Sequence, residues 1–95
     1  MTERFEITTT DGETLEARWD SPDRPGFTTV FCHPSPVDGG SMMAPLMISV
    51  TQKLVARGHS VLRFNFRGVG SSTGEYGGGD AEIIDVDAAV SVARD

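Results

Sequence analysis

Residues 27–42, FTTVFCHPSPVDGGSM, change from strand-like to loop-like sequence at a single point. Phe27 to Cys32 is a short run of β-branched and aromatic residues with apolar side chains on both faces, the pattern of a strand buried inside a sheet. From His33 to Ser41 the chain carries two prolines and two glycines, which predicts a loop. Ligands of α/β sheets bind beyond the carboxyl ends of such strands, so this loop is the first candidate site.

The segment before this strand predicts a β-hairpin. Phe5 and Ile7 alternate with polar residues, and a second alternating run contains Leu15, Ala17 and Trp19. Between the two runs lies Asp11-Gly12, a pair that tolerates the positive φ angles of a tight primed turn.

The segment after the loop predicts a helix, a strand and a second helix. One helical face is formed by Met43, Met47, Val50 and Leu54, with Thr51 away from it and with Arg57 and Gly58 as its end. His59 to Phe66 is the next strand and Arg67 to Gly79 the next loop. Asp80 is the expected N-cap of a final helix, Ala81 to Arg94, where length and alanine content favour a helix over a strand.

These elements predict an α/β fold in the order β-β-β-α-β-α. An N-terminal antiparallel hairpin is followed by a βαβ unit, which implies parallel pairing and a right-handed crossover. The length of 95 residues allows one domain, 1–95.

Composition excludes several classes of protein. Eight Lys and Arg against 14 Asp and Glu give a net charge of −6, which argues against nucleic acid or an anionic membrane as a partner. Cys32 is the single cysteine, so an internal disulfide is impossible and a reducing compartment is favoured. No stretch is long enough to span a bilayer, and the N-terminus lacks the apolar core of a signal peptide, so we expect a cytoplasmic protein.

A second informative stretch, RFNFRGVGSS at residues 63–72, follows the strand after the helix. Together with the His-Pro-x-Pro loop that begins at His33, it resembles the α/β-hydrolase superfamily, most closely its small bacterial serine-hydrolase branch. The resemblance covers nearly the whole chain but only the N-terminal portion of such an enzyme, so the domain is expected to be incomplete. The resemblance implies that Ser35, two positions after the histidine, supplies one backbone N–H of an oxyanion hole, a role that Pro36 cannot take because it has no N–H. His33 itself could act as a general base in the cleft or organise this loop, and we favour the second role.

A catalytic triad is not expected within these 95 residues. GSSTG at residues 70–74 matches the G-x-S-x-G nucleophile motif, but the glycines that follow cannot open a helix directly. Both histidines, His33 and His59, precede Ser72, whereas the family places its histidine after the nucleophile. We therefore expect no catalytic residue in this chain and no activity of the chain alone.

Other reactive-looking residues have structural interpretations. Cys32 and His33 point to opposite faces of a strand, which predicts a buried, inert thiol, and His59 is expected on the solvent side or as a cap. Arg67 is expected to pair with the acidic final helix. Three methionines are expected in the core beside the first helix: Met42, Met43 and Met47. A group of glycines suggests a phosphate cradle only weakly: Gly68, Gly70, Gly74 and Gly77 to Gly79. Four carboxylates are expected to form a solvated helix face rather than a metal cluster: Asp80, Glu82, Asp85 and Asp87.

Two functions remain open. The chain is part of a serine hydrolase that transfers the acyl group of a small-molecule ester, thioester or amide to water once a C-terminal half completes it, with no cofactor or metal. Alternatively, it is a non-catalytic α/β module that binds a ligand or a partner chain through the His33 to Ser41 cleft. With either function, the strand Phe27 to Cys32 is expected to have an open edge, because the family's next strand is not among these residues, and this predicts self-association or a complementing chain.

Overall fold

The computed structural model describes residues 2–95 and contains the six expected strands and helices in the expected order. The elements are β1 (Thr2–Thr8), β2 (Thr14–Asp20), β3 (Phe27–Cys32), α1 (Pro45–Ala56), β4 (His59–Phe64) and α2 (Glu82–Arg94). A single 3₁₀ turn, Pro36–Asp38, interrupts the loop between β3 and α1.

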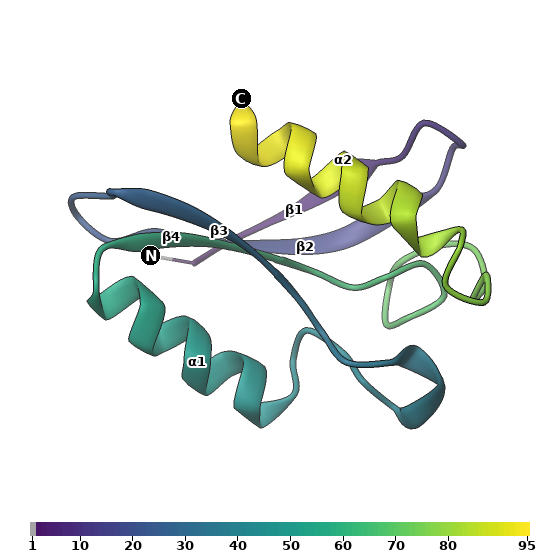
Figure 1. The fold of residues 1–95 in the computed structure, drawn as a ribbon, viewed down its shortest axis with the longest axis horizontal. Coiled ribbons are helices and arrows are strands. Elements are labelled where there is room, and N and C mark those ends of the chain that lie inside the picture. Colours follow the sequence, from purple (N-terminus) through teal and green to yellow (C-terminus); the bar gives the residue numbers. More distant parts are fainter. Residues whose placement is uncertain (1) are drawn as a thin grey trace.

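The four strands form one mixed sheet in the order β1-β2-β4-β3. β1 and β2 pair antiparallel, β2 pairs antiparallel with β4, and β3 runs parallel to β4, with Phe27 opposite His59 and Cys32 opposite Phe64. The two helices lie on opposite sides of this sheet (Figure 1). The predicted α/β class, hairpin and parallel βαβ unit are therefore confirmed.

The main core lies between the sheet and α2. Strand alternation sends Leu62 and Phe64 of β4 to this face. They are buried with residues of the hairpin, of the segment after β4 and of α2: Ile7, Leu15, Ala17, Phe66 and Ala89. The opposite face of β4 carries Val61 and Arg63, both buried, beneath α1.

The hairpin connection differs from the predicted primed turn. Thr8 pairs with Thr14, so five residues connect the strands, and the Gly12 amide donates to the Thr9 carbonyl. Gly12 has a φ of 93°, whereas no non-glycine residue in 2–95 has a positive φ. Asp11 therefore keeps an ordinary backbone conformation in a longer loop, since a primed turn would require a positive φ there as well.

Both helices begin later than the sequence pattern suggests. α1 starts at Pro45, where the fixed φ of proline suits a first helical turn. Met43 consequently lies outside the helix and is 46% exposed, while Met42 and Met47 are buried as predicted. Thr51, expected away from the core, is buried, and its hydroxyl donates to the Met47 carbonyl 2.8 Å away.

The start of α2 corrects the predicted cap. Ala81 occupies the cap position, and Asp80 is exposed and makes no side-chain cap hydrogen bond. The Glu82 side chain instead binds amides of the loop before the helix. A carboxylate near a helix N-terminus is stabilised by the macrodipole, whichever residue supplies it.

β3 lies at an edge of the sheet among the described residues, as expected for a chain of this extent. Its side chains are less buried than the apolar pattern predicted: Phe27 is 73% exposed, and Cys32 is exposed rather than buried. β4, which has a strand on each side, ends at Phe64, two residues earlier than predicted, although Asn65 and Phe66 remain buried.

Candidate functional site

The loops that follow β3 and β4 leave the sheet at the same edge. The two strands are parallel and in register to their last pair, Cys32 and Phe64. Residues 33–44 therefore start beside residues 65–81, and side chains of one loop can reach the backbone of the other. This edge holds the candidate site predicted from the sequence.

His33 joins the two loops. Its Nδ1 atom lies 2.7 Å from the Pro34 carbonyl oxygen, and its Nε2 atom lies 3.1 Å from the Phe66 amide nitrogen. A carbonyl only accepts and an amide N–H only donates, so the ring is neutral, with its proton on Nδ1. Burial lowers the pKa of His33, and its ring packs edge-to-face with that of Phe66 at a centroid distance of 4.9 Å.

The loop from Pro34 to Ser41 is closed by its own backbone. The amides of Asp38 and Gly40 donate to the Ser35 carbonyl, and the Gly39 amide donates to the Pro36 carbonyl. A Cβ atom at Gly40 would lie against the Pro34 carbonyl group, 2.7 Å from its carbon, so this closure requires glycine.

Few amides of this loop are left to bind a ligand. Pro34 and Pro36 have no N–H, and within residues 2–95 the N–H groups of Ser35, Val37 and Ser41 have no acceptor. Ser35 directly follows the residue whose carbonyl His33 holds, and its own carbonyl accepts two hydrogen bonds. Its amide is therefore a fixed donor at the carboxyl edge of the sheet.

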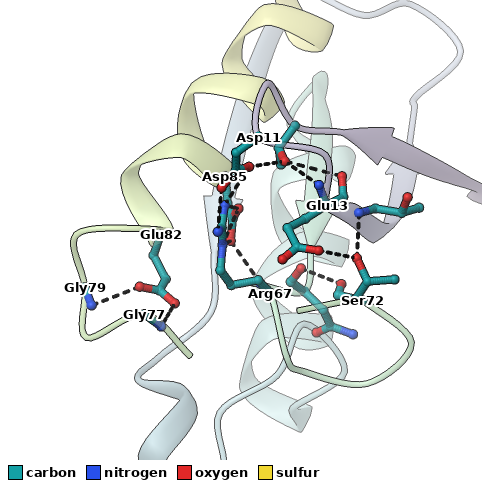
Figure 2. A network of polar contacts seen from close by, with 12 residues as sticks. Asp11, Glu13, Arg67, Ser72, Gly77, Gly79, Glu82 and Asp85 are labelled. Carbon is teal, nitrogen blue, oxygen red and sulfur yellow. Dashed lines mark hydrogen bonds and ion pairs between the residues drawn. The ribbon is translucent and has the colours of Figure 1, made fainter. Parts of the chain in front are cut away.

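Arg67 anchors the second loop in a polar network that joins the buried Asp85 to the exposed Asp11 (Figure 2). Its Nη2 lies 2.8 Å from Oδ1 of Asp85 on α2, and its Nη1 lies 2.8 Å from Oδ2 of Asp11 in the hairpin loop. The backbone amide of Arg67 also donates to Asp85. Hydrogen bonds to Asp11 and then to Asp85 raise the pKa of Arg67, and those from Arg67 and Thr9 lower the pKa of Asp11 to about 2. The predicted pairing of Arg67 with the acidic helix is confirmed, and the hairpin partner Asp11 is an addition to it.

The glycine tract before α2 binds a carboxylate of the chain itself. The amides of Gly77 and Gly79 donate to the Glu82 carboxylate at 2.8 and 2.9 Å (Figure 2). Burial raises the pKa of Glu82, but the amides of Gly77, Gly79 and Glu82 itself, together with the charge of Arg67, outweigh it and leave the pKa lowered. Because Glu82 fills the place that an anion would take, this tract is no phosphate cradle.

The solvated-face prediction for the acidic residues of α2 was half wrong. Asp80 and Asp87 are exposed, whereas Glu82 is buried and Asp85 is 0% exposed. No group of three or more His, Cys, Asp or Glu side chains within residues 2–95 is arranged to hold a metal ion.

Ser72 is held as a structural residue. Its buried hydroxyl donates to the Asn65 carbonyl at 2.7 Å and accepts from the Glu16 amide at 2.9 Å. The motif at residues 70–74 lies in turns that lead to the glycine tract, with no helix directly after it. That Ser72 is not a nucleophile stays a prediction.

Cys32 and His59 lie apart from the loop contacts. The Cys32 thiol is exposed while the neighbouring His33 is buried, and partial desolvation raises the pKa of the thiol. His59 is half-buried at the start of β4, with Nδ1 3.1 Å from the Thr29 hydroxyl and its ring 5.5 Å from that of Phe27. Neither residue reaches the Ser35 amide.

Two buried polar residues that bear on the loop were missed from the sequence. Asn65 Oδ1 accepts from the Met42 amide at 2.9 Å, and Arg63 Nη1 donates to the Met42 carbonyl at 3.0 Å. The sequence did hint at these contacts, because Arg63 and Asn65 are polar residues at alternate positions of a segment otherwise interpreted as a buried strand, RFNF at residues 63–66. Buried polar groups need partners, so such positions indicate a specific contact.

Among the helices formed by residues 2–95, none combines the length and apolar character needed to cross a membrane.

No protein-family model matches the chain. It is 38% identical over 74 residues to the uncharacterized protein RP471 of Rickettsia prowazekii (strain Madrid E), a match over 78% of this chain and 30% of that protein. Its fold matches an α/β serine hydrolase homologue from Coxiella burnetii with a TM-score of 0.87 and 35% identity, over 95% of this chain and 44% of that one. XC6422 from Xanthomonas campestris, a member of the α/β serine hydrolases without a lid, matches with a TM-score of 0.89 and 31% identity, over 98% and 44% of the two chains.

The chain therefore spans less than half the length of these relatives. Its sheet order, its two helices and its His-Pro loop lie in the part of the fold that the similarity covers. By fold and by sequence similarity, the chain therefore matches an N-terminal portion of the α/β serine hydrolases.

Proposed function

We propose that this chain contributes part of the oxyanion hole of a serine hydrolase that transfers the acyl group of a small-molecule ester, thioester or amide to water. The observation that carries the proposal is the Ser35 amide, a donor without an acceptor in residues 2–95, in a loop that His33 ties to the segment after β4. The similarity to α/β serine hydrolases supports the reaction class.

The chemistry follows from where charge develops. Attack on an acyl carbon places negative charge on the carbonyl oxygen, and a fixed N–H aimed at that oxygen stabilises the transition state without reorganising. Ser35 would supply one such donor. The nucleophile, acid and base would come from residues outside this chain, because the Ser72 hydroxyl is hydrogen-bonded to the Asn65 carbonyl and the Glu16 amide and to neither histidine. No cofactor is needed for this chemistry, and the single cysteine favours action in the cytoplasm.

The test compares Ser35→Pro with Ser35→Ala, with p-nitrophenyl acetate as substrate. Both changes are made in the natural-length protein, meaning this chain together with the part that supplies the nucleophile, acid and base in the proposal. Ser35 has a φ of −48° and a ψ of 128°, which proline can adopt, so Ser35→Pro removes the N–H with little change of backbone. We expect kcat to fall about 10²–10³-fold in Ser35→Pro, the usual cost of one lost oxyanion donor, and to stay near wild type in Ser35→Ala. Equal activity of the two variants would contradict the role of Ser35, and an inert wild-type protein would contradict esterase activity.

A second candidate, a module completed by another chain, is favoured by the edge of β3. Within residues 2–95 β3 pairs with β4 alone, and Phe27 is exposed at its start. Unpaired edges template pairing with other strands, and a lysine on the edge opposes it. We expect the 95-residue chain to self-associate in analytical ultracentrifugation and Thr28→Lys to reduce the association. A well-dispersed wild-type monomer with a cooperative melt would rule out this candidate.

A further inference from the structure

Both backbone groups of Met42 are bound by buried side chains from the end of β4. The Met42 amide donates to Asn65 Oδ1, 2.9 Å away, and the Met42 carbonyl accepts from Arg63 Nη1, 3.0 Å away. The Met42 side chain is itself fully buried. The chain is therefore fixed at the point where the Pro34–Ser41 loop ends.

The Asn65 side chain has only one orientation that satisfies its neighbours. Its Nδ2 donates to Glu16 Oε1 at 2.8 Å, and the same oxygen accepts from the Ser71 amide at 2.9 Å. The Ser71 amide, followed by Asn65 and Arg18, lowers the pKa of Glu16, so this acceptor is charged at neutral pH. With Glu16 accepting at one end, the Asn65 oxygen must face Met42.

The packing around Asn65 leaves little freedom for another arrangement. Asn65 is 2% exposed, and its backbone amide donates to the Glu16 carbonyl at 2.9 Å. A Cβ atom at Gly70 would lie 2.6 Å from Asn65 Nδ2 and 2.7 Å from Glu16 Oε1. The hairpin strand β2 and the loop after β4 thus hold this amide from two sides.

The opposite end of the loop is bound to the same short segment. His33 precedes the loop and accepts from the Phe66 amide, so residues 63–66 contact the chain just before and just after residues 34–41. Fixing both ends of a segment removes much of its conformational freedom before any ligand arrives. A donor in such a segment is pre-organised.

We propose that Asn65 is a positioning residue for the Ser35 loop, acting through its hydrogen bond to the Met42 amide. Its effect on catalysis rests on the proposed hydrolase function, whereas its effect on the loop does not. Asn65 touches no substrate in this proposal. Its role is to keep the end of the loop at one place, so that the Ser35 amide keeps its direction.

Hydrogen exchange of the natural-length protein tests the effect on the loop. The amides of Asp38, Gly39 and Gly40 are hydrogen-bonded within the loop, and none of them contacts Asn65. We expect these three amides to exchange at least about tenfold faster in Asn65→Ala than in the wild type. Thr51→Val is the matched control, because it removes a buried hydrogen bond inside α1 and leaves both ends of the loop intact.

A second pair of variants covers the case in which Asn65→Ala fails to fold. Glu16→Ala removes the acceptor that orients Asn65, and Glu16→Gln keeps an acceptor oxygen at the same place. We expect faster exchange of the same amides in Glu16→Ala and protection near wild type in Glu16→Gln. The proposal is overturned if the three amides exchange no faster in Asn65→Ala or Glu16→Ala than in Thr51→Val, after correction for global stability.

Kinetics with p-nitrophenyl acetate test the consequence for catalysis. We expect kcat of Asn65→Ala to fall about 10–100-fold with KM within about twofold, since a misplaced donor weakens transition-state stabilisation more than substrate binding. An unchanged kcat beside a deprotected loop would overturn the catalytic part. A wild-type protein without esterase activity would contradict the proposed function alone, because the exchange experiment still decides the role of Asn65.

Discussion

The Phe66 amide donates to Nε2 of His33 across 3.1 Å, so one hydrogen bond links the residue after β3 to a residue beyond the end of β4. The other ring nitrogen donates to the Pro34 carbonyl. A proton added to Nε2 would face the N–H of Phe66, and burial already disfavours the charged ring. Both effects keep His33 neutral in the folded protein.

The lowered pKa of His33 predicts a loss of stability in mild acid. The unfolded chain takes up a proton near the ordinary pKa of 6.5, whereas the folded chain does so only at lower pH. Stability should therefore be full above pH 6.5 and fall as the pH drops below it. Urea unfolding between pH 5 and 7 should show this slope in the wild type and a flatter one in His33→Gln. Thr51→Val, which removes a buried hydrogen bond but no titratable group, should keep the wild-type slope.

Replacing Arg67 should be strongly destabilising. Arg67→Met leaves the Asp85 carboxylate buried without its cation, and breaking a buried pair in this way costs about 3–5 kcal/mol. Urea unfolding at pH 7 measures the loss. Arg57→Met, at the exposed end of α1, should change stability by less than about 0.5 kcal/mol. An equal loss in the two variants would contradict the buried network as the cause.

Gly40→Ala should open the loop that carries Ser35. The new methyl group would meet the backbone carbonyl groups of Pro34 and Ser35, which cannot turn aside as a side chain could. We expect a loss of about 1–3 kcal/mol and a lower kcat with p-nitrophenyl acetate. Gly26→Ala places its methyl 3.7 Å from the Gly58 oxygen and should be tolerated. Wild-type stability of Gly40→Ala would show that the loop adopts another closure.

Ser72→Ala should reduce the stability of the protein but should not abolish its turnover of p-nitrophenyl acetate. It removes a hydroxyl that binds the Asn65 carbonyl and the Glu16 amide, a change that costs about 1–3 kcal/mol for buried groups. The hydroxyl is not free for nucleophilic attack, so p-nitrophenyl acetate should still be hydrolysed by the natural-length variant. Ser71→Ala, at an exposed position, is the control for both measurements. Complete loss of turnover in Ser72→Ala alone would make residues 70–74 a nucleophile site.

Much of the fold could be predicted because strands and helices leave a periodic record in the sequence. The alternation around Ile7 and Leu15 and the break at His33 were sufficient for the hairpin and the parallel unit. The start of α1 was misplaced because the helical spacing of the methionines already begins at Met43, before Pro45, where the helix starts. Periodicity identifies a face of a helix but says little about its first residue.

The polar contacts of the site were harder to predict. Glu82 and Asp85 look like any acidic surface of a helix. The pairing of Arg67 with this helix was predicted, but the choice of Asp85 as its partner and the two glycine amides on Glu82 follow only from the fold. Asn65 and Met42 are 23 residues apart, and their hydrogen bond depends on how β4 meets the loop before α1. Such pairings depend on tertiary structure, whereas the role given to Ser35 came from a motif.

The sheet order also sets a sequence of events during synthesis. The hairpin β1–β2 is complete once residue 20 is made, but β2 has β4 as its other neighbour, and β3 also pairs with β4. A nascent chain that ends before residue 59 therefore holds β3 with no strand to pair with, and an isolated hairpin is only marginally stable in water. Emergence of β4 from the ribosome is the step at which the hairpin and β3 become one sheet.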